Sequence, residues 1–67
     1  MSWTTMPPEL RELAERVCTP RELDVLRLRA EGHGRYRIAA ILGINGSRVE
    51  QLRSSAFNRL RKEGYPL

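Results

Sequence analysis

Residues 42–64 read LGINGSRVEQLRSSAFNRLRKEG, a short turn followed by a long segment in which apolar residues recur at helical spacing. The residues at i, i+3, i+7 and i+11 of this segment are Val49, Leu52, Ala56 and Leu60. Because they share one face of a helix, they predict a long amphipathic helix with one buried stripe. Asn45 suits the N-cap of this helix, because its side-chain oxygen can accept a hydrogen bond from a first-turn N–H group that has no acceptor within the helix. Gly64 suits the end of the helix.

Two further helices are predicted in the first half of the chain. The first covers residues 8–17, PELRELAERV, with Thr5 as its expected cap. The second starts at residues 19–22, TPRE, a capping box in which the Thr hydroxyl accepts from the Glu N–H and the Glu carboxylate accepts from the Thr N–H; this helix runs to about Glu31. The apolar residues are Leu10, Leu13 and Val17 in the first helix and Leu23, Leu26 and Ala30, flanked by Val25 and Leu28, in the second.

A third helix is predicted over residues 35–42, RYRIAAIL, with Ile38, Ala39, Ile41 and Leu42 as its apolar residues. Gly43 should end it, and Ile44 should reach into the core from the turn. A short helix, a turn containing Gly and a longer helix with a polar outer face form the helix-turn-helix pattern. The sequence therefore predicts an all-α fold, a small bundle of about four helices without strands. In this interpretation residues 19–64 form the helix-turn-helix domain, and residues 1–18 form an N-terminal tail and a short amphipathic helix.

The length and composition exclude several classes of protein. A chain of 67 residues has room for one small domain. It has no apolar run near the roughly 20 residues that cross a bilayer and no signal peptide, so we expect a cytoplasmic protein without membrane contact. One Cys and one His cannot build a zinc site or an internal disulfide, and no pocket of acid, base and nucleophile is indicated, so we expect no metal, no cofactor and no enzyme activity. Cys18 is interpreted as a small, partly buried side chain, with a reactive or intermolecular thiol as the alternative.

The charge of the chain is unevenly distributed. Residues 1–31 carry five Arg against six Asp and Glu, whereas residues 32–62 carry six Arg and one Lys against the single Glu50. The second half is therefore strongly basic within a net charge of +4. A basic block attracts polyanions, of which nucleic acid is the commonest in the cytoplasm, and a solvated basic face without a partner is the alternative.

In a helix-turn-helix unit the second helix enters the major groove of double-stranded DNA, and its N-terminal residues reach the base edges. The outward positions in the first three turns of the predicted last helix are all polar. They are Ser47, Arg48, Glu50, Gln51, Ser54 and Ser55. We predict that the bases are read by Ser47, Arg48, Gln51 and Ser54, because Gln can bond adenine, Arg can bond guanine and Ser can bond either. Phosphate contacts are predicted for Arg35, Tyr36, Arg37, Arg53, Arg59 and Lys62.

Arg35 and Arg37 lie in the first turn of the third predicted helix, where the positive end of the helix dipole disfavours cations. A phosphate bound there would reverse this cost, because backbone N–H groups and both guanidinium groups would converge on one anion. The alternative is that both side chains extend into water. Tyr36 would add a contact from its hydroxyl to the phosphate. The alternative is that its side chain only covers the core.

These residues give the chain a resemblance to a known family. From Thr19 to about Lys62 it is similar to the helix-turn-helix of region 4 of bacterial sigma factors, and less closely to the C-terminal DNA-binding domain of LuxR-type response regulators. The segments TPRELDVLRLRAEG, IAAILGIN and RVEQLRSSAFNRLR carry this resemblance. It implies a compact helical domain, major-groove binding by the last helix and, for region 4, recognition of the promoter −35 element and docking on the flap of RNA polymerase.

Within this resemblance, Gln51 matches the base-contacting Gln of the sigma pattern and Arg48 matches an Arg of that pattern. The sigma recognition helix normally opens with an Arg-Glu pair, and this chain has Gly46 and Ser47 in those places. Glu50 stands where a basic residue is usual. These differences argue against the standard −35 element as the target.

Two functions are compatible with these features. The first is sequence-selective binding of double-stranded DNA by a stand-alone transcription regulator of the kind that bacterial or phage genomes encode. The second is a protein-interaction adaptor that binds RNA polymerase or another regulator, with Trp3 and Met6 as its contact; the alternative for Trp3 is that it folds back over a small core. The oligomeric state is open, although the small area that one such domain covers on DNA favours a homodimer or a partner protein.

Overall fold

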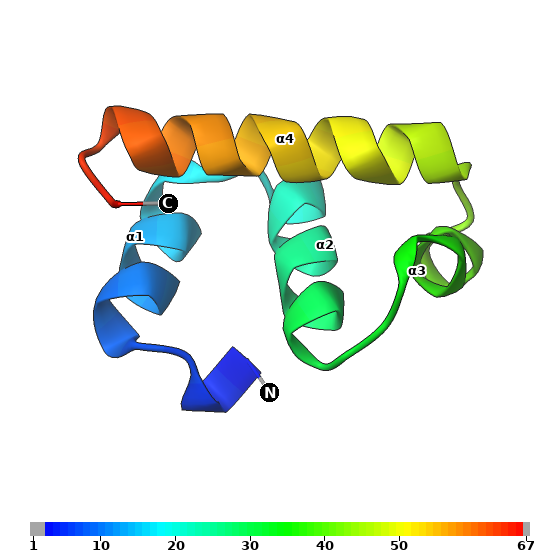
Figure 1. The fold of residues 1–67 in the computed structure, drawn as a ribbon, viewed down its shortest axis with the longest axis horizontal. Helices are drawn as coiled ribbons and strands as arrows, with labels where there is room; N and C mark the ends of the chain where they lie inside the picture. Colours follow the sequence, from blue (N-terminus) through cyan, green and yellow to red (C-terminus); the bar gives the residue numbers. More distant parts are fainter. Residues whose placement is uncertain (1–2, 67) are drawn as a thin grey trace.

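The longest helix lies across the other three in the computed structural model, which describes residues 3–66 (Figure 1). The elements in chain order are the 3-10 turn η1 (Trp3–Thr5) and the helices α1 (Pro8–Val17), α2 (Pro20–Ala30), α3 (Arg35–Leu42) and α4 (Gly46–Lys62). Helices α1, α2 and α3 lie on the same side of α4 (Figure 1). The described residues contain no strand, so the predicted all-α fold is confirmed. None of the helices in this part of the chain has both the length and the hydropathy needed to cross a bilayer.

The apolar stripe of α4 is buried along its whole length, as the sequence predicts. Val49, Leu52, Ala56 and Leu60 are all buried. A helix of 17 residues is about 25 Å long, so its two ends contact different neighbours. The N-terminal end of α4 packs against α3, its C-terminal half packs against α1, and α2 lies against its middle (Figure 1).

The stripe divides the interior into two hydrophobic clusters. The first, which we call the helix-turn-helix core, consists of Val25, Ile38, Ala39, Val49 and Leu52, with Leu28, Leu42 and Ile44 packed against it. The second, which we call the N-terminal core, consists of Leu10, Ala14 and Leu60, with partly buried neighbours that include Trp3, Met6, Leu23, Leu26 and Phe57. Helix α2 contributes to both clusters from different faces, so α2 and α4 connect them.

Two apolar residues lie differently from the prediction. Val25, expected at the margin of the buried face of α2, is fully buried at its centre, whereas Leu23 and Leu26 are only partly buried. Ile41, which the sequence groups with the other apolar residues of α3, lies outside the core, because its side chain is 46% exposed. The eight-residue helix α3 packs only one face on α2 and α4, and Ile38 and Ala39 occupy that face.

Thr5, which the sequence offered as the cap of α1, does not occupy the N-cap position of this helix. Thr5 lies in the 3-10 turn η1, and the N-cap position of α1 is occupied by Pro7, which makes no side-chain cap hydrogen bond. Pro8 is the first helical residue, where its missing N–H costs nothing.

The N-terminal segment folds back on the helices. Trp3 and Met6 pack against the N-terminal core and line an apolar cavity of about 190 Å³ with Leu10, Leu26 and Phe57. Of the two interpretations of Trp3, the structure therefore supports the one in which it folds back over a small core, and Trp3 and Met6 contribute to the fold.

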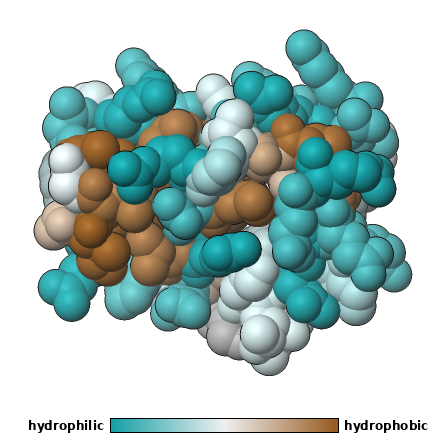
Figure 2. All heavy atoms as spheres, turned by 180° about the vertical axis from the view of Figure 1, so that it is seen from behind, coloured by the Kyte–Doolittle hydropathy of each residue, from teal (hydrophilic) through white to brown (hydrophobic). Residues whose placement is uncertain are grey.

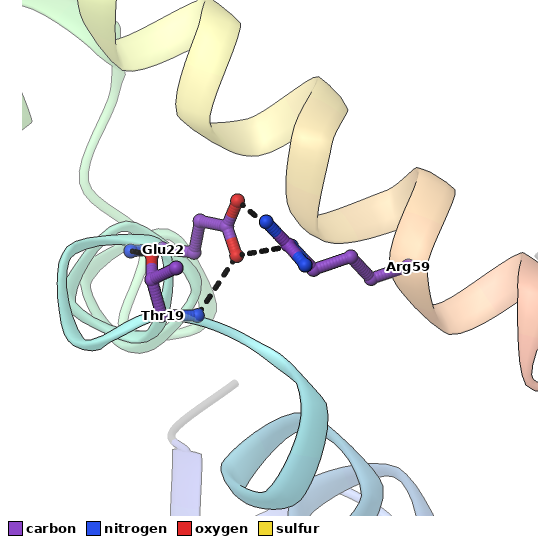
Figure 3. Close-up of polar contacts among 3 residues, drawn as sticks. All are labelled: Thr19, Glu22 and Arg59. Carbon is purple, nitrogen blue, oxygen red and sulfur yellow. Dashed lines mark hydrogen bonds and ion pairs between the residues drawn. The ribbon is translucent and has the colours of Figure 1, made fainter.

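Glu22 joins the capping box of α2 to the far half of α4. The Thr19 N–H donates to the Glu22 carboxylate at 2.9 Å, and the Glu22 N–H donates to the Thr19 hydroxyl at 3.3 Å, which confirms the predicted box. Figure 3 shows the Arg59 side chain extending from α4 to the same carboxylate, with its Nε 3.0 Å from one oxygen. Glu22 is buried and Arg59 is half exposed, so the carboxylate depends on these two partners for the hydrogen bonds that water would otherwise supply.

Replacing Glu22 with Ala would lower the free energy of unfolding by about 2–3 kcal/mol, because the Thr19 N–H and the Arg59 guanidinium both lose their acceptor. Gln at this position keeps an acceptor for Thr19 and would cost less. Urea unfolding followed by circular dichroism measures the loss. The control Asp24→Ala removes the exposed ion pair with Arg21, whose groups are 3.8 Å apart, and would change the free energy by no more than about 0.5 kcal/mol. Equal losses for Glu22→Ala and Asp24→Ala would contradict a special role for Glu22.

Candidate nucleic-acid interface

A tight turn between α3 and α4 sets the start of α4. Gly43 ends α3 in the left-handed conformation, with φ of +70°, which a residue with a Cβ adopts only with strain. The next residue, Ile44, donates its N–H to the Ala39 carbonyl and packs against the helix-turn-helix core, as predicted. The Asn45 side chain then accepts from the Arg48 N–H at 2.7 Å, which confirms Asn45 as the N-cap. The first turn of α4 is thereby held against the core by both backbone and side-chain bonds.

The residues predicted to read bases lie together on the exposed face of this first half of α4. Ser47, Arg48, Gln51 and Ser54 are all exposed, while Val49 and Leu52 face the core. The structure therefore brings the four residues to one face of one rigid helix. That these four residues contact bases stays a prediction.

Local contacts orient several side chains on this face. Arg48 Nη1 lies 3.4 Å from Gln51 Oε1, a long hydrogen bond that leaves the Gln51 NH₂ group available to donate. One turn further on, Arg53 Nη1 is 3.5 Å from a carboxylate oxygen of Glu50, and its guanidinium lies 4.9 Å from the centre of the Phe57 ring. Arg53 is thus held along α4 by two neighbours.

A shallow, open depression of about 540 Å³ runs along the same face. Its lining consists of Arg35, Ser47, Glu50, Gln51, Ser54 and Ser55. Five of these residues belong to α4, whereas Arg35 comes from the start of α3. The sequence predicts a phosphate contact for Arg35 and does not reveal that this residue lies beside the four residues predicted to read bases.

The start of α3 carries three exposed residues, Arg35, Tyr36 and Arg37. Tyr36 is 74% exposed, so it does not cover the core. Its hydroxyl accepts a hydrogen bond of 2.8 Å from Arg35 Nη2, and the Arg35 guanidinium lies 4.7 Å from the centre of the Tyr36 ring. Arg35 and Tyr36 therefore hold each other in place.

The remaining predicted phosphate contacts are distributed along α4 and are not grouped. Lys62 is exposed in the last turn, about 22 Å from Ser47 along a helix that rises about 1.5 Å per residue. Arg59 donates to the buried Glu22 carboxylate. The ion pair gives Arg59 a structural role that the sequence did not reveal, because the two residues are 37 positions apart.

Cys18 lies beside the N-terminal core and is partly buried. Burial raises the pKa of the Cys18 thiol, the Glu22 carboxylate raises this pKa further, and the Arg59 guanidinium partly opposes the effect. A raised thiol pKa keeps the sulfur protonated near neutral pH and lowers its reactivity. This favours the interpretation of Cys18 as a packing side chain. Across residues 3–66, no three His, Cys, Asp or Glu side chains are grouped as ligands of a metal ion would be.

A second surface feature lies at the end of the molecule that carries α3. Figure 2 shows hydrophobic atoms gathered there, on the side opposite to that of Figure 1. The exposed Ile41 lines a shallow depression together with Leu28 and Leu42. The acidic residues Asp24 and Glu31 line the same depression. Arg27 lines it as well, so this surface is apolar with charges of both signs, unlike the polar face of α4.

Comparison with known proteins identifies the segment that contains this interface. The sequence model of the family described as Sigma-70, region 4 matches residues 16–62. The match begins near the end of α1 and ends at the last residue of α4, so it includes the whole helix-turn-helix core. Neither the curated proteins nor the solved structures contain a significant match.

Replacing Asn45 with Ala would lower the free energy of unfolding by about 1 kcal/mol, because the Arg48 N–H at the start of α4 loses its acceptor. Asp at this position retains the acceptor and would preserve stability. Chemical denaturation of the three proteins measures the effect. Asn58→Ala is the matched control, since the Asn58 side chain only accepts from the exposed Arg61 on the surface of α4 and its loss would change stability by less than about 0.5 kcal/mol. A loss in Asn58→Ala as large as that in Asn45→Ala would argue against the cap.

Proposed function

Because the chain belongs to the family of sigma-70 region 4 domains, we propose that it binds double-stranded DNA sequence-selectively and regulates transcription. Domains of this family are DNA-binding helix-turn-helix units. The observation that supports selectivity is the exposed polar face formed by Ser47, Arg48, Gln51 and Ser54 on a helix whose opposite side is buried. A helix fixed in this way can present base-reading groups to the major groove without a large loss of conformational freedom.

In this proposal the first half of α4 enters the major groove. Gln51 bonds an adenine through its amide, and Arg48 bonds a guanine through its guanidinium. Ser47 and Ser54 lie on the same face and make single hydrogen bonds to neighbouring bases or phosphates. The hydrogen bond between Arg48 and Gln51 keeps the two longer side chains side by side until DNA replaces it.

The basic side chains around this face bind the DNA backbone. Arg37 and Tyr36 are exposed at the start of α3, and Lys62 is exposed at the end of α4. Arg53 would contact phosphate by exchanging its partner Glu50. Arg59 is the least favourable of the predicted phosphate contacts, because binding a phosphate would remove the ion-pair partner of the buried Glu22 carboxylate.

RNA polymerase is the second partner that membership of this family suggests. Trp3 and Met6, the residues expected to contact it, line the cavity at the N-terminal core, so their removal would weaken the fold as well as any contact. The stand-alone role, the homodimer, the cytoplasmic location and the similarity to LuxR-type domains remain predictions.

The test is a titration of the protein against a random duplex library at two salt concentrations, followed by sequencing of the retained DNA. A single enriched motif is expected. Gln51→Ala would then cost about 1–3 kcal/mol at one base pair, whereas Arg37→Ala would weaken binding to all sequences and reduce the salt slope by about one. Glu15→Gln on the exposed side of α1 is the control and should bind like the unaltered protein. Retention of DNA without any motif, or equal losses on cognate and scrambled DNA for Gln51→Ala, would contradict selective binding.

A further inference from the structure

Gly46, the first residue of α4, lies beside the side chain of Arg35 at the leading end of the polar face of α4. A Cβ atom at position 46 would lie 3.4 Å from both Cγ and Cδ of Arg35 and 3.5 Å from its Nε. The aliphatic stem of Arg35 therefore lies just beyond the place that a Cβ at position 46 would fill, beside the first turn of α4. The side chain begins on α3 and ends beside the residues of α4.

The guanidinium of Arg35 is oriented by its neighbour. Tyr36 accepts from Arg35 Nη2 at 2.8 Å, and the guanidinium carbon lies 4.7 Å from the centre of the Tyr36 ring. A planar guanidinium that is held by a hydrogen bond and by an aromatic ring loses less conformational freedom when it binds. Arg35 is therefore organised for a contact of fixed geometry before any ligand arrives.

The donors of this guanidinium are largely available. Arg53 and Arg59 pair with carboxylates of Glu50 and Glu22, but no carboxylate within residues 3–66 forms an ion pair with Arg35. A guanidinium has five N–H donors, and only one of those of Arg35 is used by Tyr36. Its neighbours in the depression include Ser47 and Gln51, two of the residues that we propose as base-reading, and Glu50, which pairs with Arg53.

We infer that Arg35 is a specificity-determining residue that bonds a guanine in the major groove at the leading end of α4, beside Gly46. The guanine would offer its O6 and N7 atoms to two donors of the guanidinium. This inference rests on the proposed DNA binding and assigns a base contact to a residue for which the sequence predicted only a phosphate contact. The base-reading surface would then be formed by side chains of both α3 and α4.

The test compares Arg35→Gln with Arg37→Gln in the same library selection. Each variant loses one positive charge from the first turn of α3, and both residues are exposed, so circular dichroism should show the same helix content as the unaltered protein. Because Gln bonds adenine and does not match guanine, Arg35→Gln should lower the preference for guanine at one position of the motif about tenfold or more and favour adenine there. Arg37→Gln should weaken binding to all sequences and leave the motif unchanged.

Tyr36→Phe is a second variant that keeps the ring and the charge. It removes the hydroxyl that orients Arg35, so it should reduce the same guanine preference severalfold without changing the salt dependence. If Arg35→Gln and Tyr36→Phe both select the same motif as the unaltered protein, the inference is overturned while selective DNA binding stands. If the unaltered protein selects no motif at all, the proposed function and this inference both fail, and that result is seen without any variant.

Discussion

The structure depends on one constraint, the need of α4 to bury a single continuous stripe against two separate clusters of side chains. A 17-residue helix is too long for one small cluster to cover. The first half of the stripe, with Val49 and Leu52, closes the helix-turn-helix core, and the second half, with Leu60, closes the N-terminal core. Because both clusters lie on the same side of α4, the other side remains free and polar. The candidate interface is a consequence of this arrangement.

The ion pair between Glu22 and Arg59 reinforces the arrangement. Through it, the start of α2 is bonded to the last turn of α4, next to Leu60 of the N-terminal core, and the same carboxylate caps α2 (Figure 3). A buried carboxylate is costly unless its hydrogen bonds are satisfied, so the two interactions depend on each other. One of the basic residues in the positively charged half of the chain is thereby used for the fold.

The candidate interface and the fold use opposite faces of the same helix, and this limits how each can change. The cap Asn45 and the turn at Gly43 hold the start of α4, which also carries the side chains that we propose as base-reading. Changes on the exposed face can alter its chemistry with little effect on the core. Because Arg35 lies beside Gly46, that face continues onto α3, and a substitution at either position would alter the same part of the surface.

The sequence by itself determined the features that depend on near neighbours in the chain. Helical spacing identified the four buried residues of α4, and cap chemistry identified Thr19, Glu22 and Asn45, because these interactions span no more than a few residues. It did not show that Ile41 lies outside the core, since periodicity does not reveal how much of a short helix its neighbours cover. It also named Thr5 as the cap of α1, where the structure has Pro7. Only the tertiary structure decided that Arg59 bonds Glu22, that Trp3 joins the N-terminal core and that Arg35 lies against Gly46. Each of these contacts joins different elements, and such distances are set by how helices pack, which no local pattern encodes.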